Sequence, residues 1–581
     1  MDIYEVQFTI VRLLLIPLLY PMNIIWYSWS KKAKNVSKNL IERILKDNQT
    51  TVFGLEYSFA SIKDLNDYRK KVPLAESKDV QPYVHRMHFG GESNVLISAD
   101  VAKYFLTSGT SSGPATIVPC SAVDLKFKAF LFGPMMMAQV MSHLGPATVY
   151  YRGMSALMSS RGESNSEYKT ESGLRAGVKG FASPSAVLWT APMEVNQLSS
   201  ILPSYMLQWV FGLIYEDTAY ILEEFSSKFI YLINVLLDNH EKIFRCIETG
   251  IPPSDLAADA LGYQEITQAL RASPRRANEL RDIFKASCKR NHEGLVKAIL
   301  PNLKYVACIC TGSFSVYERS IRYYIGDTPI YNVAYGSSEA GYVGMSVGMN
   351  DDQYVLCPAT GFFEFIPQDD EEVAAHGMET KLFNEMVPGK KYEVVCTTQS
   401  GLYRYRTHDI IQCTGYQNEL PLFRFKYRDN VVLNLCSENV YGDQLQAAVK
   451  RVQEDRDIVF NYYSIAIDYE KSPPGYKFYV ELAQSCRDDA TKEMETKVEQ
   501  VLANALCDIN PRYKQREASG RISHPAVCFV KEGSYAELEQ VMYEAKKKNG
   551  VSYGQIKVPT MLKAEGHDQW IKFLQSRRVQ V

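Results

Sequence analysis

The pattern of apolar residues changes near Tyr427–Asn430, and this change divides the chain into parts of unequal size. Before it, over about residues 100–420, short apolar runs alternate with helical stretches, which is typical of a mixed α/β domain. After it, two strand-like runs flank the turn KSPPG and precede a helix, a strand and a helix, which predicts a smaller α+β domain. Because 581 residues exceed one ordinary core, we expect an N-terminal segment over 1–34, a large domain over 35–428 and a smaller domain over 429–581.

One helix is predicted inside the large domain. Apolar residues from Ile221 to Leu236 recur at the spacing of a single helical face. The expected role of this helix is core packing. The alternative is that the helix and the preceding stretch PSYMLQWVFGLIY form a wall of an apolar substrate pocket.

The N-terminal segment leaves two interpretations open. The stretch Leu13–Trp29 has no charged residue, and Lys31, Lys32 and Lys34 follow it. Its length is at the short end of a bilayer span, about 17–25 residues, and prolines interrupt it. It is therefore either a membrane anchor or re-entrant segment, or a helix docked on the protein itself. If it spans a membrane, the basic flank would stay cytoplasmic.

Charge and cysteine usage exclude some classes of partner. The formal net charge of −2 provides no basic excess to neutralise phosphates, so no nucleic-acid partner is expected. No CxxC pair occurs, and Cys308 and Cys310 alternate in an apolar run, which favours buried reduced thiols over a metal site. We therefore expect an intracellular monomer, in the cytoplasm or on the cytoplasmic face of a membrane such as the endoplasmic reticulum.

The stretch TSGTSSGPATIVP, Thr107–Pro119, is a candidate phosphate cradle. Its glycines allow backbone N–H groups to converge, and the hydroxyls of Ser108, Thr110 and Ser111 add donors that suit phosphate oxygens. It lacks the Gly-Lys-Ser/Thr ending of a Walker loop. A solvated Gly/Ser linker is the alternative.

A second candidate is the stretch PIYNVAYGSSEAG, Pro329–Gly341. A strand-like run here ends in Ser337, Ser338 and Glu339. A carboxylate at a strand end can hold Mg²⁺, and serines can bind a nucleotide or a carbonyl group. An ordinary polar loop explains the composition equally well.

Two single residues complete the candidates. Asp409, in GLYRYRTHDIIQCTGY, could accept both hydroxyls of a ribose, or could pair with Arg404 or Arg406 in a surface ion pair. Lys557, in SYGQIKVPTML, could stabilise charge that develops on an acyl phosphate, or could be an ordinary solvated lysine.

In their order along the chain, these four segments resemble the GH3 family of acyl-acid amido synthetases, within the class of adenylate-forming enzymes. The matching stretches are SGTSSG, YGSSE, YRYRTHD and QIKVP, and QPYVHR, TGSF, FFEF and LNLCSEN match between them. The resemblance covers about residues 38–575. It implies an α/β fold in which a large N-terminal domain of mixed sheets and helices, similar to adenylate-forming enzymes, carries a smaller mobile α+β C-terminal domain.

The resemblance implies ATP and Mg²⁺ as cofactors, and a small carboxylic acid and an amine such as an amino acid as substrates. The acid would be joined to AMP, and the amine would attack the acyl adenylate. Each matching position takes a role: Ser108, Thr110 and Ser111 would contact the ATP phosphates, Tyr335 and Ser338 would line the nucleotide pocket, Glu339 would hold Mg²⁺, Asp409 would bind the ribose, Lys557 would be catalytic in adenylation, and Arg428 and Asp429 would form a hinge.

Three departures from the family pattern keep a second function open. The loop runs Gly113–Thr116 where the family often has Gly-Glu-Arg-Lys, so its basic groups are missing. His408 replaces a usual glycine, and Thr560 replaces a usual arginine. The leading hypothesis is an ATP-dependent amido synthetase. The alternative is a catalytically impaired GH3-fold protein, attached to a membrane or not, that binds a small molecule or a partner.

Overall fold

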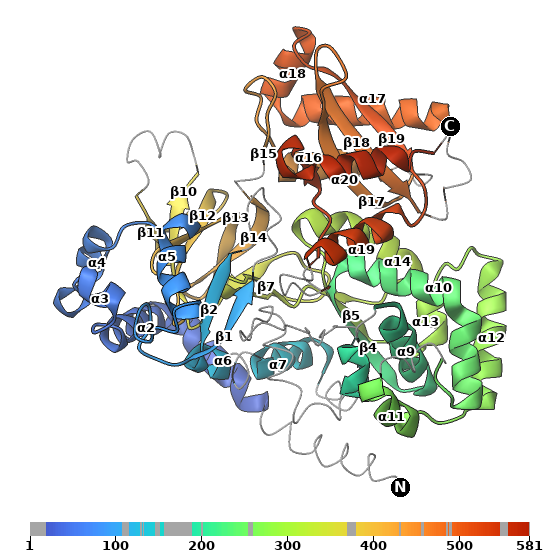
Figure 1. Cartoon of the computed structure of the whole chain (residues 1–581), viewed down its shortest axis with the longest axis horizontal. Helices are drawn as coiled ribbons and strands as arrows, with labels where there is room; N and C mark the ends of the chain where they lie inside the picture. Colours follow the sequence, from blue (N-terminus) through green and yellow to red (C-terminus); the bar gives the residue numbers. More distant parts are fainter. Residues whose placement is uncertain are drawn as a thin grey trace.

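The computed structural model contains three larger sheets, two of four strands and one of eight (Figure 1). The residues that the structure describes are 19–106, 116–127, 131, 133–145, 152–155, 189–198, 201–253, 260–368, 379–428, 432–454, 458–483, 486, 491–546, 553 and 556–579. The three sheets lie side by side in Figure 1, with the C-terminal one above the other two.

The first four-stranded sheet is parallel and buried. Its strands, in order, are β3 (Arg152–Ser155), β4 (Thr218–Phe225), β5 (Tyr305–Ile309) and β6 (Ile330–Tyr331). Parallel strands are covered on both faces, and β5 (YVACI) has the continuous apolar run that such burial favours. The main helices of this region are α9 (Ile201–Ile214), α10 (Ser226–Thr249), α12 (Pro274–Cys288) and α14 (Glu318–Ile325).

The helix predicted from Ile221 begins later than expected. Residues Ile221–Phe225 belong to strand β4, and α10 starts at Ser226. Ile221, Leu222 and Phe225 of this strand fall at a spacing that also fits the apolar face of the following helix, so the pattern extends back into β4. The core-packing role is correct, because Phe229, Leu232 and Leu236 are buried in the main cluster.

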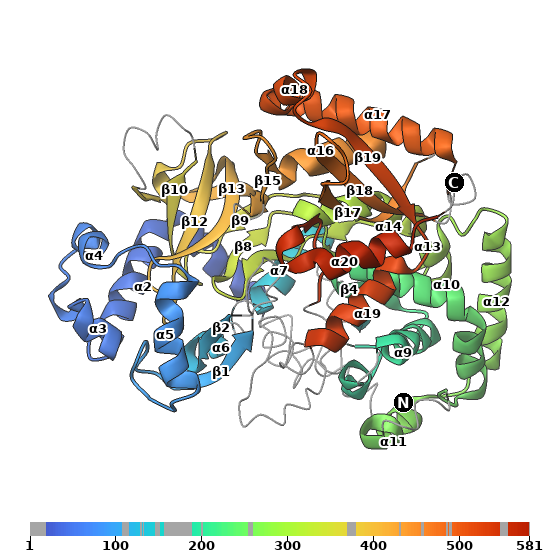
Figure 2. The same ribbon diagram turned by 45° about the horizontal axis from the view of Figure 1, so that its top comes forward.

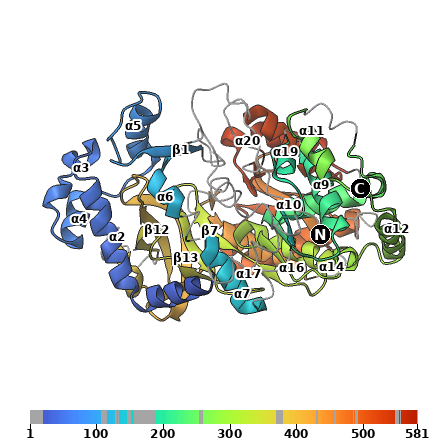
Figure 3. The same ribbon diagram turned by 90° about the horizontal axis from the view of Figure 1, so that it is seen from below.

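The eight-stranded sheet is antiparallel. Its order is β11 (Lys381–Leu382), β10 (Phe362–Pro367), β12 (Lys391–Thr397), β13 (Tyr405–Gln417), β14 (Leu420–Arg428), β9 (Tyr354–Leu356), β8 (Gly341–Ser346) and β7 (Ala334–Ser337). The helices α2 (Ala33–Asp47), α4 (Leu65–Lys71), α5 (Ser77–His88) and α7 (Gly133–Leu144) lie in the same region (Figure 3). The two-stranded pair β1 (Val101–Leu106) and β2 (Ile117–Ser121) accompanies them.

The described part of the N-terminal segment is a helix docked on this region. Residues 19–31 are helical, and the side chain of Trp26 is buried in the second core cluster. The rings of Trp29 and Phe127 are stacked, 6.3 Å apart between centroids. Nδ2 of Asn418 donates a 2.8 Å hydrogen bond to Oγ of Ser30. The docked-helix interpretation therefore holds for this part of the segment. Residues 13–18 lie outside the described residues.

Among the helices that the structure describes, none combines the length and the apolar character that crossing a membrane requires. Membrane attachment of the N-terminal segment therefore stays a prediction.

The C-terminal region contains the elements predicted for it. β17 (Phe460–Asp468) and β18 (Gly475–Leu482) form the hairpin, β19 (Ser523–Val530) lies parallel to β18, and β20 (Met561–Leu562) lies parallel to β17. The helices are α16 (Gly442–Val452), α17 (Lys492–Ile509), α18 (Pro511–Ala518), α19 (Ser534–Lys546) and α20 (Ala564–Ser576). Figure 1 and Figure 2 show α19 beside α10, and the two helices are joined by the side chains of Lys228 and Glu539.

Two core clusters join segments that are distant in the sequence. One cluster contains buried residues of 154–330 together with residues of 433–574. The other contains residues of 19–141 together with residues of 334–423. The C-terminal region therefore packs on the parallel-sheet region through an apolar interface. The domain boundary at 428/429 remains a prediction.

Candidate active site

Asp409 is the most strongly held carboxylate of the predicted site. It lies on β13 opposite Arg428 in the register of the β13–β14 hairpin. Nε of Arg428 is 2.7 Å from Oδ1, and the hydroxyl of Tyr335 donates to Oδ2 at 2.6 Å. The residue is only 3% exposed. The opposite charge of Asp409 raises the pKa of Arg428, while burial and then Asp409 raise the pKa of Tyr335. Arg428 is thus charged and Tyr335 neutral at neutral pH.

The alternative of a surface ion pair between Asp409 and Arg404 or Arg406 is wrong. Nε of Arg404 is 3.0 Å from Oε2 of Glu364. Nη2 of Arg406 is 2.7 Å from Oε2 of Glu393. Arg404, which precedes β13, thus pairs with a glutamate on β10, and Arg406 of β13 pairs with a glutamate on β12.

An aromatic wall continues the site from Tyr335. Its ring centroid is 5.4 Å from that of Phe425 on β14. Gly312, in the TGSF stretch, has φ 59°, and a side chain there would meet the Phe425 ring 2.7 Å away. Only glycine combines this backbone conformation with so close an approach. The family match assigns no role to the TGSF stretch. In the structure, Gly312 of this stretch lies against the Phe425 ring.

Lys557 lies on a second pair of aromatic rings, which the TGSF stretch connects to Phe425. Its Nζ is 3.8 Å from the centroid of the Phe225 ring and 5.6 Å from that of Phe314. The two phenylalanine rings are stacked at 4.7 Å. A cation over an aromatic face is attracted by the ring quadrupole. The sequence places Phe225 only on the predicted helical face and Phe314 only within the TGSF match, and it assigns neither ring to Lys557.

The charge of Asp409 is one of several that act on Lys557. Burial lowers the pKa of Lys557 to about 8. Among the charged neighbours, Glu224 and Asp409 act against this decrease in the pKa, whereas Arg428 adds to it. A lysine near the C-terminus, Asp409 and Arg428 thus share one electrostatic environment.

Glu339 and Ser338 lie in the turn between β7 and β8. The negative charge of Glu339 contributes to the raised pKa values of Tyr335, Arg428 and Tyr405. This carboxylate therefore belongs to the electrostatic environment of these three groups. The described residues contain no cluster of three or more side chains that could hold a metal ion by themselves. One carboxylate is nevertheless compatible with Mg²⁺, which is usually held by one or two carboxylates, substrate phosphates and water.

Other predicted residues lie outside the described residues: Ser108, Thr110 and Ser111 of the hydroxyl-rich loop, and Asp429 of the hinge. The flanks of the loop are described. Leu106 of β1 and Ile117 of β2 are paired, so both flanks belong to one hairpin. Gln81, in the QPYVHR stretch, donates to the Ile117 carbonyl at 2.9 Å. These flanks argue against a linker between domains.

The three departures have different structural settings. His408 has φ 59°, a left-handed conformation that explains why a glycine is usual at this position. Its Nδ1 lies 3.7 Å from Oε1 of Glu393. The carbonyl of Thr560 accepts a 2.7 Å hydrogen bond from the N–H of Ile465, so this residue is used by its backbone. Residues 113–115 of the loop lie outside the described residues.

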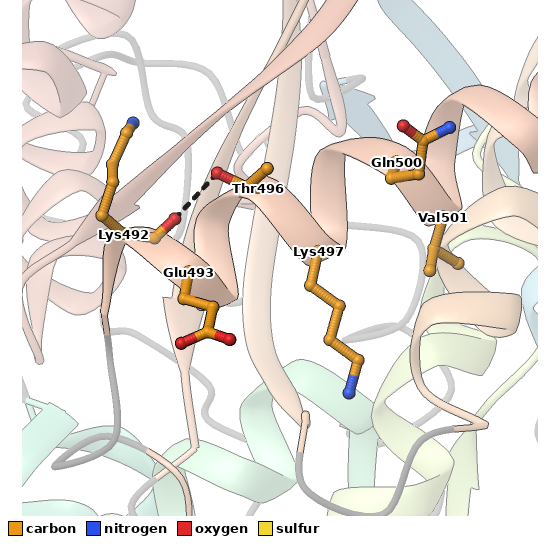
Figure 4. Close-up of a pocket in the computed structure, with 6 residues that line it drawn as sticks. All are labelled: Lys492, Glu493, Thr496, Lys497, Gln500 and Val501. Atoms are coloured by element: carbon orange, nitrogen blue, oxygen red, sulfur yellow. Dashed lines mark hydrogen bonds between the residues drawn. The ribbon is translucent and has the colours of Figure 1, made fainter.

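A shallow hollow of about 600 Å³ lies along one side of α17 and is separate from this site (Figure 4). Its lining comes from a single helix: Lys492, Glu493, Thr496, Lys497, Gln500 and Val501. Figure 4 shows these side chains spread along the helix, with the Thr496 hydroxyl bonded to the Lys492 carbonyl at 2.9 Å. None of the residues predicted for nucleotide binding lines it.

The fold is similar to that of solved adenylate-forming enzymes. A 2-hydroxyisobutyryl-CoA ligase in its postadenylation state is similar over 93% of this chain and 91% of its own, with a TM-score of 0.53 and 11% identity. The GH3.15 acyl acid amido synthetase in complex with 2,4-DB gives a TM-score of 0.83 at 22% identity, over 97% of this chain and 96% of its own. At these identities the structures establish the fold.

The chain belongs to the GH3 family. The N-terminal domain of the family matches residues 26–330, its central domain residues 354–428 and its C-terminal domain residues 443–566. Similar proteins include the 4-substituted benzoates-glutamate ligase GH3.12 of Arabidopsis thaliana, 28% identical over 92% of this chain and 94% of that protein. The indole-3-acetic acid-amido synthetase GH3.8 of Oryza sativa subsp. indica is 29% identical over 90% of this chain and 87% of that protein. The resemblance noted from the motifs is confirmed.

Proposed function

We propose that this protein is an ATP-dependent acyl-acid amido synthetase. The observation that supports the proposal is that Asp409 and Lys557, from distant parts of the sequence, share one electrostatic environment. The TGSF stretch joins their surroundings, since its Gly312 lies against Phe425 and its Phe314 stacks on Phe225. Lys557 is held over Phe225, and the pKa of its amine responds to the charges of both Asp409 and Arg428. The relatives named above are ligases that join acids to amino acids, and they support the same class of reaction.

The proposed reaction has two steps. A carboxylate oxygen of the acid attacks the α-phosphorus of ATP, which forms the acyl adenylate and releases pyrophosphate. The amine then attacks the acyl carbon, the C–O bond to AMP breaks, and the amine loses a proton. Activation is needed because a carboxylate resists attack by an amine, whereas AMP is a good leaving group.

Each residue has a distinct task in adenylation. Asp409 keeps free lone pairs beside its bonds to Tyr335 and Arg428, and these can accept the ribose hydroxyls. Lys557 supplies positive charge where negative charge develops on the phosphate. Ser108, Thr110 and Ser111 would contact the phosphates, and Tyr335 and Ser338 would line the nucleotide pocket.

Glu339 would hold Mg²⁺ together with the phosphates, and the ion would neutralise the charge of the triphosphate. Arg428 is anchored to Asp409, so a pivot at Asp429 would turn the C-terminal region from a fixed point. Such a turn would expose the adenylate to the amine after the first step.

Pyrophosphate exchange tests the function. Wild-type protein is incubated with ATP, Mg²⁺, labelled pyrophosphate and a panel of carboxylic acids. Acid-dependent exchange that is lost in Asp409→Asn and Glu339→Gln supports the synthetase. ATP binding without exchange for any acid would instead support the impaired binding protein, for which the missing basic groups after Gly113 provide a reason.

Membrane association through residues 13–29, an intracellular or membrane-face location and a monomeric state remain expectations from the sequence. Cell fractionation of the full chain and of a chain lacking residues 1–34 tests the first two, and light scattering tests the third. If both chains remain in the soluble fraction, a membrane anchor is excluded.

A further inference from the structure

A buried ion pair joins the parallel-sheet region to the C-terminal region. Nζ of Lys228, in the first turn of α10, is 2.8 Å from Oε2 of Glu539 on α19. The hydroxyl of Tyr553 donates to the same carboxylate oxygen at 2.9 Å, and Nζ of Lys228 lies 4.0 Å from the centroid of the Tyr553 ring. The side chains of Lys228 and Glu539 are only 4% and 9% exposed. We call Lys228, Glu539 and Tyr553 the clasp.

The clasp and the position of Lys557 share the same two structural supports. On one side, Phe225, which lies beneath Lys557, immediately precedes the helix that carries Lys228. On the other side, Tyr553 precedes Lys557 by four residues in the sequence, and the N–H of Ile556 donates to the Tyr553 carbonyl at 2.9 Å. Movement of either side would therefore move Lys557 relative to Phe225.

The chemistry of the clasp suits an orientation device better than a general stabiliser. Desolvation of a buried ion pair opposes its Coulombic attraction, so apolar residues often stabilise an interface equally well. Such a pair does penalise any arrangement that separates its partners, since each charge would then be buried alone or would have to be rehydrated. The surrounding interface is apolar, and Lys228 and Glu539 give it one preferred register.

We propose that the clasp positions Lys557 for adenylation and must open when the C-terminal region turns for amide formation. Lys228, Glu539 and Tyr553 are positioning residues, because they act through the segment that carries Lys557. This inference rests on the proposed function for its kinetic part only. The seating of Lys557 by the clasp can be measured without any substrate.

The first test is the pH dependence of Lys557 acetylation by trace acetic anhydride, read by peptide mass spectrometry. The variants are Lys228→Met and Glu539→Gln, and the matched control is Glu537→Gln. Glu537 lies on the same helix but pairs with Arg577 at the surface. In the wild type, half-maximal reactivity is expected near pH 8, in line with the lowered pKa of Lys557.

The two variants separate a change in the position of the Lys557 amine from the direct Coulombic effect of the removed charge on its pKa. Removing the positive charge of Lys228 would raise the pKa of Lys557 through the field, and removing the negative charge of Glu539 would lower it. If the clasp holds Lys557 in place, both variants expose its amine to water. Both should then raise the pH of half-maximal acetylation of Lys557 by one unit or more, toward the ordinary lysine pKa of about 10.4. Opposite shifts, or no shift in Glu539→Gln, would overturn the proposal.

Tyr553→Phe keeps the ring over Lys228 and removes one hydrogen bond, so it provides a milder variant if the charge variants do not fold. It should shift Lys557 reactivity upward by a smaller amount, and an unchanged profile would also contradict the clasp.

The second test separates the two half-reactions. Clasp variants should slow acid-dependent pyrophosphate exchange at least tenfold, while transfer from a preformed acyl adenylate to an amine changes less than twofold. Equal losses in both half-reactions would contradict a role in positioning Lys557. If the wild type shows no exchange with any acid, the proposed function fails, whereas the acetylation result still decides whether the clasp seats Lys557.

Discussion

Arg428 and Asp409 stand opposite each other in the β13–β14 hairpin, with Nε of the arginine 2.7 Å from Oδ1 of the carboxylate. The residue predicted as one side of a hinge is therefore tied directly to the residue predicted to bind ribose. This contact places the predicted start of the C-terminal region at the proposed nucleotide site, and it makes both residues sensitive to the same substitution.

Asp409→Asn should weaken both ATP use and folding. Losing a charged acceptor for the ribose hydroxyls should lower kcat/KM for ATP about 10- to 100-fold. The unpaired Arg428 should lower the free energy of unfolding by about 1–2 kcal/mol. This is less than the roughly 3–5 kcal/mol of a fully buried pair, because the Arg428 side chain is 35% exposed. Steady-state kinetics and urea unfolding measure the two effects.

Asp352→Asn provides the matched control for Asp409→Asn. Asp352 pairs with Arg424 on the same strand as Arg428, but both of these side chains are exposed. Its stability should change by less than about 1 kcal/mol and its activity should not change. If Asp352→Asn lowered kcat/KM and the free energy of unfolding as much as Asp409→Asn, the effects could not be assigned to the Asp409–Arg428 pair.

The rate of adenylation should fall as pH rises through about 8. Burial lowers the pKa of Lys557 to that value, so its amine loses its positive charge at lower pH than an ordinary lysine. The charged form is the one that stabilises the transition state, so activity is present below this pH and lost above it. Lys557→Ala should lower the exchange rate about 10²- to 10³-fold and abolish this alkaline limb. An unchanged alkaline limb in Lys557→Ala would assign the titration to another group.

The same pKa shift has a defined effect on stability. The folded pKa of Lys557 lies below its unfolded value of 10.5, so folding disfavours the charged amine. This destabilisation is fully present below pH 8 and is relieved as pH rises from 8 to 10.5. The free energy of unfolding should be measured for wild type and Lys557→Met at several pH values. Relative to the variant, the wild type should become more stable as pH rises over this interval. A difference that is constant with pH would contradict the shift.

His408→Gly should stabilise the protein. His408 has φ 59°, a conformation that costs a side-chain-bearing residue about 1–2 kcal/mol and a glycine almost nothing. Thermal unfolding should show a higher Tm for the glycine variant. His408→Ala removes the imidazole but keeps the backbone strain, so it should show no such gain. Equal stability of the two variants would assign the effect to the imidazole rather than to the backbone.

Trp26→Ala should destabilise the protein by about 3–5 kcal/mol, because a buried indole leaves a cavity. Trp26 is 6% exposed, in contrast to its neighbour Tyr27, which is 56% exposed. Tyr27→Ala should therefore change the free energy of unfolding by less than about 0.5 kcal/mol. Similar effects of both substitutions in urea unfolding would contradict docking of residues 19–31.

The sequence could predict the parts of the site that depend on short motifs. Asp409, Glu339 and Lys557 were chosen from local stretches, and the structure brings them into one electrostatic environment. The hairpin β17–β18 was also predictable, because its turn residues and strand-like runs are contiguous.

Long-range pairings could not be predicted in the same way. The partner of Asp409 depends on the register of β13 and β14, which includes irregularities after Ile410 and Cys413. The contact between Lys228 and Glu539 depends on how two regions dock, and neither residue belongs to a motif. The predicted start of α10 is too early because Ile221, Leu222 and Phe225 of β4 fall at a spacing that also fits the apolar face of that helix.

The central claim is that one nucleotide occupies the space between Asp409 and Lys557. Protection of Lys557 from acetylation by saturating Mg-ATP tests it most directly, with the exposed Lys572 as an internal reference. We predict at least fivefold protection of Lys557 in the wild type, none at Lys572, and loss of protection in Asp409→Asn at the same ATP concentration. Equal acetylation of Lys557 with and without ATP, while calorimetry shows that the wild type binds ATP, would contradict the account.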